Sequence, residues 1–167
     1  MQIVSIQSLS KTQIENFKSY CDQLDLYFHC YALENDIDNR SKTFVCLDEN
    51  IVKGYITLSN SEVDFKDIPY EYKNKTPRYP FPAIKIARLA VSYKYRHKGI
   101  GKALLKEAIS RATMVSVSFG VLILTVDAKK DSVTFYEHFG FKKLIGYEEK
   151  YFISIQTLVK ALLKSKD

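Results

Sequence analysis

Cysteine is scarce in this chain of 167 residues, which has three cysteines and no tryptophan. Cys21, Cys30 and Cys46 are odd in number and show no metal-ligand spacing, which argues against a disulfide framework and against a zinc site. We therefore expect buried free thiols in a reducing compartment, and we expect no metal.

Long apolar runs are also missing. None approaches the length that spans a membrane, and the first residues, Met1–Ile6, lack the basic segment and apolar core of a signal peptide. No internal repeat or linker divides the chain, and its length fits one domain with a real core. These absences predict a single cytoplasmic domain over residues 1–167, without a membrane partner.

Acidic residues are unevenly placed. Residues 1–50 hold 4 basic and 8 acidic residues, a net charge of −4, whereas residues 51–167 hold 21 basic and 11 acidic residues, a net charge of +10. This asymmetry suggests a polyanionic partner for the second part. A solvated lysine-rich surface with a few cationic groups for a phosphate ligand explains it equally well, so both interpretations stay open here.

Hydrophobic periodicity predicts a mixed α/β chain with a central strand–helix–strand unit and hairpins at both ends. The loop at residues 60–82, with Pro69, Pro77, Pro80 and Pro82, has the length of a functional loop. Strands are expected at residues 2–7, 41–47, 51–58, 83–91, 121–126, 141–144 and 150–157, and helices at residues 22–34, 99–116, 131–139 and 158–166.

The segment Arg96–Gly101, with the sequence Arg-His-Lys-Gly-Ile-Gly, lies between an apolar strand and a strongly helical run. A strand that feeds a glycine-containing turn at a helix start builds an anion site, because the first N–H groups of the helix converge on one spot. Gly99 and Gly101 have no Cβ, so a phosphate can approach the backbone closely. The segment therefore predicts a phosphate-bearing cofactor.

The same segment resembles the acetyl-coenzyme A signature of the GNAT superfamily of N-acetyltransferases, Gln/Arg-x-x-Gly-x-Gly/Ala. Three further segments, Arg88–Val91, Val126–Ala128 and Phe135–Phe141, resemble the family in order and spacing. The resemblance implies a GNAT fold of the α/β (α+β) class. Its mixed, mostly antiparallel sheet would splay around the central strand–helix–strand unit, with helices on both faces.

The resemblance also implies a site. Acetyl-CoA would lie between the strands at 83–91 and 121–126, and a backbone N–H near Leu89 would stabilise the tetrahedral intermediate. Tyr136 would be the catalytic acid, because a phenol with a pKa of about 10 suits protonation of a departing thiolate. The residues implied in cofactor binding are Leu89, Ala90, Val91, Arg96, His97, Lys98, Gly99, Ile100, Gly101, Lys102 and Asp127, with Lys94 adding positive charge.

A narrower resemblance covers most of the chain. One GNAT branch consists of toxin–antitoxin toxins that acetylate the α-amino group of aminoacyl-tRNA. The segments that resemble it are Leu24–Phe28, Ser41–Val45, Pro77–Pro80 and Tyr151–Ile153, whereas Phe17–Tyr20, Lys42 and Ala87 depart from it. The branch implies aminoacyl-tRNA as substrate, a small ribbon–helix–helix antitoxin as partner, and a monomer or homodimer.

No general base stands out among His29, His97 and His138. An aminoacyl ester would ease this difficulty, because α-amino groups titrate near pH ~8 and the ester lowers that value further. Two alternatives stay open. One is acetylation of a small-molecule amine or protein N-terminus without RNA, and the other is a non-catalytic coenzyme A-binding module.

Overall fold

The computed structural model describes residues 1–73 and 78–164. Residues 74–77 of the expected loop, with Pro77, and residues 165 and 166 of the expected last helix lie outside the described residues. The contacts gather in two compact units. Unit 1 comprises residues 1–59 and 86–108, and unit 2 comprises residues 60–85 and 109–167. Each unit has its own hydrophobic core.

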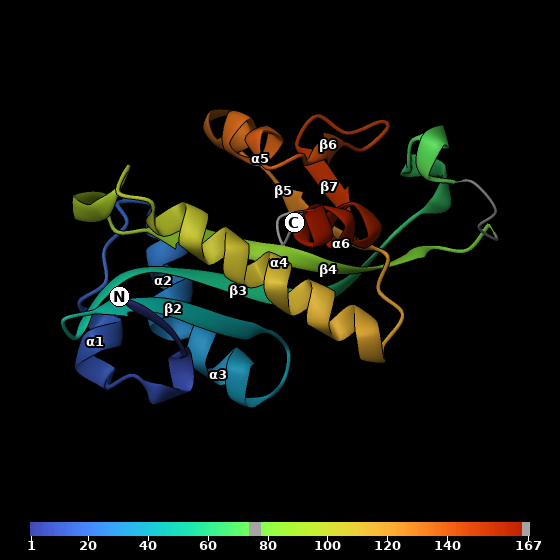
Figure 1. Ribbon diagram of the computed structural model, residues 1–167. Helices are drawn as coiled ribbons and strands as arrows, with labels where there is room; N and C mark the ends of the chain where they lie inside the picture. The colour runs from blue at the N-terminus through green and yellow to red at the C-terminus, as the bar shows by residue number, and fades with distance from the viewer. Residues whose placement is uncertain (74–77, 165–167) are drawn as a thin grey trace. The chain divides into compact units, whose positions relative to one another are not determined.

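Strands and helices are arranged around one sheet (Figure 1). Its strand order is β1-β2-β3-β4-β5-β7-β6, and the pairs β1–β2, β2–β3, β5–β7 and β6–β7 are antiparallel. The strands are β1 (Gln2–Ser5), β2 (Lys42–Asp48), β3 (Ile51–Val63), β4 (Phe81–Val91), β5 (Ile123–Asp127), β6 (Lys142–Lys143) and β7 (Lys150–Ser154). The α-helices are α1 (Lys11–Glu15), α2 (Asp22–Cys30), α3 (Ala32–Ile37), α4 (Ile100–Ser118), α5 (Val133–His138) and α6 (Ile155–Lys164). Short 3-10 helices are η1 (Ile6–Ser8), η2 (Phe65–Asp67), η3 (Tyr70–Tyr72), η4 (Tyr93–Tyr95) and η5 (Lys130–Ser132). The expected mixed, mostly antiparallel fold is confirmed.

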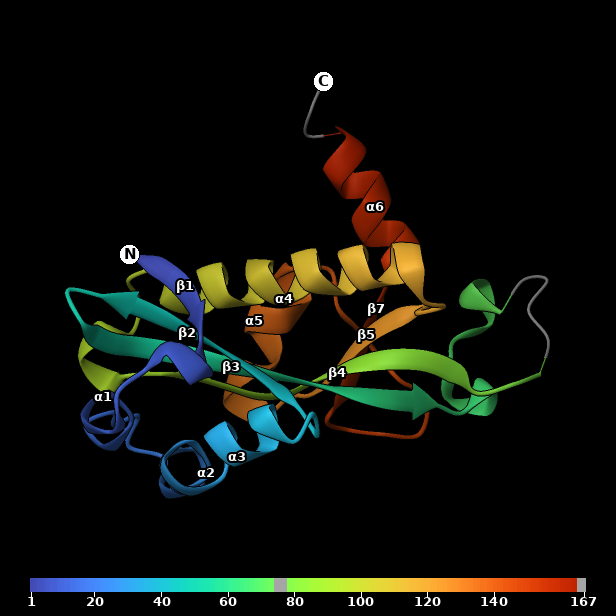
Figure 2. The same cartoon turned by 90° about the horizontal axis from the view of Figure 1, so that it is seen from below.

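Unit 1 is a layered structure. Helices α1, α2 and α3 cover one side of its strands, and the first half of α4 lies on the other side (Figure 2). Three aromatic rings form the centre of its core: Phe28 stacks on Tyr55 with ring centroids 4.5 Å apart, and Phe17 packs at 4.9 Å from Phe28. The Tyr55 hydroxyl donates to the Leu24 carbonyl over 2.8 Å. These contacts fix α2 and the segment before it against the sheet.

The single helix expected at residues 22–34 is wrong, because the chain breaks at Tyr31 and α3 starts a new direction. The Asp36 carboxylate supplies the reason. It is buried and accepts hydrogen bonds from the Thr43 backbone N–H and from the Gln7 amide, both at 2.7 Å. These tertiary bonds anchor α3 to β2 and η1 after the break.

The cysteine expectation is also partly wrong. All three cysteines are thiols outside any disulfide and lie in unit 1, but only Cys46, on β2, is buried. Cys21 is half-buried, and Cys30 is exposed at the last residue of α2.

Unit 2 has a separate core that includes Ile68, Phe81, Ile123 and Phe152. The Tyr72 ring packs edge-on against Phe152 at 5.1 Å, so that η3 closes one side of this core. The helical segment that contains α5 ends at Gly140, which has a positive φ of +86°. This agrees with the helix expected at residues 131–139.

Two strand expectations in unit 2 need correction. The strand expected at residues 150–157 ends at Ser154, because the Ser154 hydroxyl accepts the Thr157 backbone N–H at 3.1 Å and caps α6. Only Lys142 and Lys143 of the strand expected at residues 141–144 pair with β7. The helix expected at residues 158–166 starts earlier, at Ile155.

Candidate cofactor and active site

The turn between η4 and α4 has the backbone geometry of an anion site. His97 and Gly99 adopt positive φ angles of +59° and +81°, and the Gly99 carbonyl accepts the Ala103 N–H at 3.0 Å as the helix begins. The N–H groups of Ile100, Gly101 and Lys102 therefore have no carbonyl four residues earlier inside the helix. No acidic residue stands in the first turn of α4. An anion can thus meet these N–H groups and the positive end of the helix dipole.

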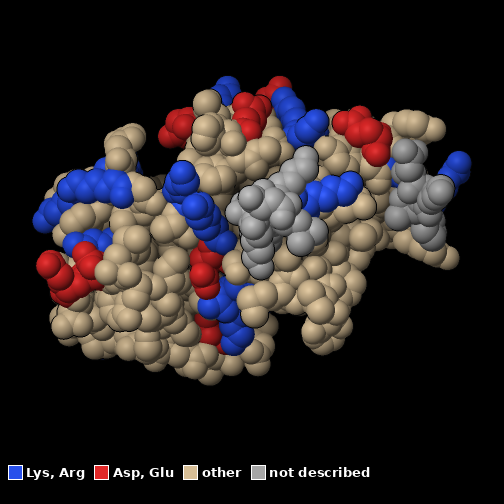
Figure 3. Space-filling view, viewed as in Figure 1, with Lys and Arg blue, Asp and Glu red and all other residues tan. Residues whose placement is uncertain are grey.

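Cationic side chains surround this turn. Arg96, His97, Lys98 and Lys102 are exposed, and Lys and Arg gather over the chain that leads into α4 (Figure 3). Arg96 also has a structural bond that the sequence did not reveal, from its guanidinium to the Ser19 carbonyl at 2.6 Å. The turn is therefore tied to the loop between α1 and α2. The predicted residues from 96 to 102 come together as one cationic turn in unit 1.

The end of β4 lies close to β3 at one glycine. A Cβ built on Gly54 would stand 2.7 Å from the Ala90 carbonyl oxygen and 3.1 Å from side-chain atoms of Ile100 and Leu104. The absence of a side chain at Gly54 thus sets the position of the strand end that includes Leu89, Ala90 and Val91 and of the start of α4. Sequence reasoning missed Gly54, although a glycine inside a strand often marks a close backbone approach.

Tyr136 lies in unit 2, on α5. Its ring packs edge-on against Phe135 at 5.2 Å and Phe141 at 5.5 Å, and burial raises the pKa of its hydroxyl. No hydrogen-bond partner of this hydroxyl is seen, and no fully buried side-chain N or O atom of the described residues lacks a partner. The Tyr136 oxygen therefore keeps accessible surface, while its ring is held by apolar packing. His138, two residues further on, packs against Phe139.

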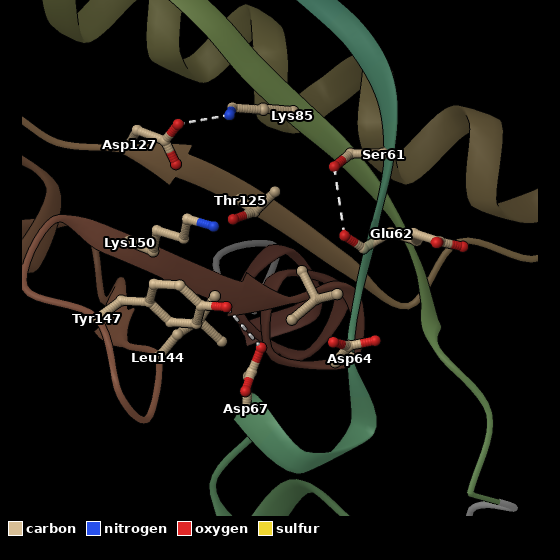
Figure 4. Close-up of a pocket in the computed structure, with 11 residues that line it drawn as sticks. Ser61, Glu62, Asp64, Asp67, Lys85, Thr125, Asp127, Leu144, Tyr147 and Lys150 are labelled. Atoms are coloured by element: carbon tan, nitrogen blue, oxygen red, sulfur yellow. Dashed lines mark hydrogen bonds and ion pairs between the residues drawn. The ribbon is translucent and has the colours of Figure 1, made fainter.

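Asp127, at the end of β5, faces a cavity of about 230 Å³ in unit 2 (Figure 4). Its carboxylate forms an ion pair with Lys85 of β4. Across the cavity the Tyr147 hydroxyl donates to Asp67 at 3.1 Å. The remaining lining residues include Glu62, Asp64, Thr125 and Lys150. Sequence reasoning included Asp127 but missed this polar pocket, because its residues come from β3, β4, β5, β7 and the segments around them.

Other site classes find little support in the described part of the chain. No group of three or more His, Cys, Asp and Glu residues is arranged to hold a metal ion among the described residues. None of the described helices is both long and apolar enough to cross a membrane. His29, on α2, bonds through Nε2 to the Phe17 carbonyl at 2.8 Å, which gives it a structural partner in unit 1.

Comparison with known proteins adds three findings. The Acetyltransferase (GNAT) domain family matches residues 5–159. The tRNA-acetylating toxin of Mycobacterium tuberculosis is 33% identical over 130 residues, which cover 77% of this chain and 78% of the toxin. Among solved structures, AtaT complexed with acetyl-methionyl-tRNAfMet has a TM-score of 0.89 at 21% identity, with coverage of 97% of this chain and 98% of that one. A mutant AtaT bound to the C-terminus of the antitoxin AtaR and acetyl-CoA has a TM-score of 0.80 at 19% identity, with coverage of 96% and 97%.

Proposed function

Because this chain belongs to the GNAT acetyltransferase family, and is thereby an acetyl-CoA-dependent N-acetyltransferase, we propose that its acceptor is the α-amino group of aminoacyl-tRNA. One observation carries the proposal: the 33% identity, over three quarters of both chains, to a protein named for tRNA acetylation. The net charge of +10 on residues 51–167 fits a polyanionic acceptor.

We propose that acetyl-CoA binds as co-substrate at the strand–turn–helix of unit 1. The donor set fits a diphosphate, because free N–H groups of α4 and the cations Arg96, Lys98 and Lys102 meet without an acid in the first helical turn. His97, Gly99, Ile100 and Gly101 supply the backbone of this cradle. The backbone of Leu89, Ala90 and Val91 would pair with the pantetheine arm, and Asp127 is a further predicted cofactor residue.

In the proposed reaction the α-amine attacks the acetyl carbonyl carbon, and the carbon–sulfur bond breaks. The departing thiolate takes the proton of the Tyr136 phenol, and the amine nitrogen gives its proton to water, which restores the phenol. Burial raises the pKa of Tyr136, so the phenol keeps its proton throughout the neutral range, and giving that proton to the thiolate costs more free energy than it would from a phenol with the ordinary pKa of about 10. No side-chain base is required, because an α-amine beside an ester is already neutral in good part near pH ~8.

We infer that the chain acts in the cytoplasm as the toxin of a toxin–antitoxin pair. A small ribbon–helix–helix antitoxin is the partner that this role requires, and the catalytic unit is residues 1–167 as one domain, in a monomer or homodimer. The inference is supported by the fold that this chain shares with AtaT, a mutant of which was solved with the C-terminus of the antitoxin AtaR.

The test is an acetyl-transfer assay with radiolabelled acetyl-CoA and a pool of charged tRNA. We expect label in the tRNA fraction and, after mild alkaline hydrolysis, N-acetylated amino acids in the mass spectrum. Deacylated tRNA, free amino acids and a lysine peptide serve as controls. Label in the free amines or the peptide, with none in charged tRNA, would establish the alternative acceptors instead.

A further inference from the structure

An exposed tyrosine and a half-buried one form a tilted aromatic pair beside the cationic turn of unit 1. The ring centroids of Tyr20, in the loop between α1 and α2, and Tyr93, on η4, are 4.0 Å apart with the planes inclined by 42°. Tyr20 is 68% exposed. We call these two residues, with Lys18 and Lys94, the Tyr20–Tyr93 platform.

The loop that displays Tyr20 is firmly anchored. Ser19 is buried, and its backbone N–H and hydroxyl both donate to the Asp25 carboxylate, at 2.9 Å and 2.6 Å. Its carbonyl accepts the bond from Arg96. Tyr20 itself holds a φ of +62°, a left-handed conformation that is costly for an aromatic residue. The surroundings therefore impose a strained backbone that presents an aromatic ring to solvent.

Positive charge accompanies the rings. Lys18 and Lys94 are exposed, and the Lys94 ammonium lies 5.7 Å from the centroid of the Tyr93 ring. The neighbouring Tyr20 hydroxyl lowers the pKa of Tyr93, and Lys94 and Lys18 lower it further. Aromatic faces interleaved with lysines are the combination that binds nucleobases together with their phosphates, in a sequence-tolerant way.

We propose that the Tyr20–Tyr93 platform binds a nucleoside flanked by phosphates: the base stacks on the exposed Tyr20 ring, and Lys18 and Lys94 meet the phosphates. This unit occurs at every position of an RNA strand and again at the 3′-phosphoadenosine end of coenzyme A. The inference rests on the proposed function for the ligand's presence, and it adds Lys18, Tyr20 and Tyr93 to the residues predicted to meet a phosphate-bearing ligand.

The test measures binding of deacylated tRNA, coenzyme A and 3′-dephospho-coenzyme A to the full chain by calorimetry or anisotropy. Tyr20→Leu removes the stacking face, and Tyr20→Phe retains it without the hydroxyl. Tyr70→Leu removes a tyrosine that is 81% exposed elsewhere and serves as the matched control. Loss of the stacking contact between one base and one aromatic ring weakens binding by about 5-fold to 150-fold.

We expect Tyr20→Leu to weaken one ligand by that factor, with Tyr20→Phe and Tyr70→Leu near the wild type. A loss confined to tRNA assigns the platform to the acceptor RNA. A loss for coenzyme A that is smaller for the 3′-dephospho form assigns it to the cofactor. Unchanged affinity for all three ligands would overturn the proposal.

A second variant tests the phosphate contact without a substitution in the loop that carries Tyr20. Lys94→Gln should reduce the salt dependence of binding by about one phosphate contact, whereas Lys11→Gln, at a side chain that is 88% exposed on α1, should not. Equal slopes for both variants would contradict a phosphate contact at Lys94. Because no acetyl transfer is measured, failure here is distinct from failure of the acetylation assay.

Discussion

At the scale of single residues, the Tyr136 phenol can be removed without disturbing its packing. Tyr136→Phe keeps the ring contacts with Phe135 and Phe141 and deletes only the oxygen. We expect kcat to fall about 100-fold or more, as for other general acids, with an unchanged melting temperature and acetyl-CoA affinity. Steady-state kinetics beside calorimetry would check this, and an unchanged kcat would remove Tyr136 from the reaction.

The same residue predicts the shape of the pH profile. Burial raises the pKa of Tyr136 above its ordinary value of about 10, so that the phenol keeps its proton throughout the assay range. Activity should rise as the acceptor amine loses its proton and then stay level up to pH ~10. The linked stability is full below pH ~10 and is lost at higher pH. A falling limb that starts near neutral pH and disappears in Tyr136→Phe would contradict this account.

Gly54 supports the cofactor strand through its missing side chain. Gly54→Ala would place a methyl group 2.7 Å from the Ala90 carbonyl oxygen, so that backbone has to move. We expect a loss of about 1–3 kcal/mol in the free energy of unfolding and weaker coenzyme A binding. Gly120→Ala is the control, since no atom lies within 4 Å of its Cβ position. Equal stability of the two variants would refute the close approach.

Single residues also show how much of the candidate site could be predicted from the sequence. Arg96, Gly99 and Gly101 could be predicted as site residues because an anion turn needs local residue types at fixed spacing. Gly54 and Ser19 were missed, because their roles depend on which distant strand or side chain comes near. Likewise, the residues next to Tyr20 in the sequence do not predict its positive φ angle.

At the scale of elements, α3 depends on one buried carboxylate. Asp36→Ala would leave the buried Thr43 N–H without an acceptor. We expect the free energy of unfolding to fall by about 2–3 kcal/mol in urea titrations. Asp38→Ala removes only the exposed pair with Arg40 and should cost less than about 1 kcal/mol. A similar cost for both variants would mean that Asp36 does not anchor α3.

The same element explains the limits of periodicity. Apolar spacing predicted one helix at residues 22–34, whereas the chain breaks at Tyr31 and α3, which is bonded through Asp36 to β2 and η1, runs on to Ile37. β7 ends at Ser154 because the hydroxyl of this residue caps α6. From the sequence alone, a capping serine cannot be told from a serine inside a strand. These boundaries thus depend on tertiary or capping bonds, whereas the order strand–turn–helix could be predicted from local residue types.

At the scale of the whole molecule, the order of elements was predictable, because hairpins and a strand–helix–strand unit leave few arrangements. The charge asymmetry was equally visible, but it suited an RNA partner and a plain cationic surface alike. The family match over residues 5–159 shows the acetyltransferase, and the identity to a tRNA-acetylating toxin supports the proposed RNA acceptor.

The central claim is that the backbone and cations of the turn at residues 96–102 hold the diphosphate of acetyl-CoA. Calorimetric titration of the purified chain with acetyl-CoA and with acetyl-pantetheine, which lacks the diphosphate, tests it directly. We predict one acetyl-CoA bound per chain and acetyl-pantetheine bound at least about 100-fold more weakly, as expected when charge-assisted hydrogen bonds to two phosphates are lost. Equal affinity for the two ligands, or no heat with acetyl-CoA, would contradict the account.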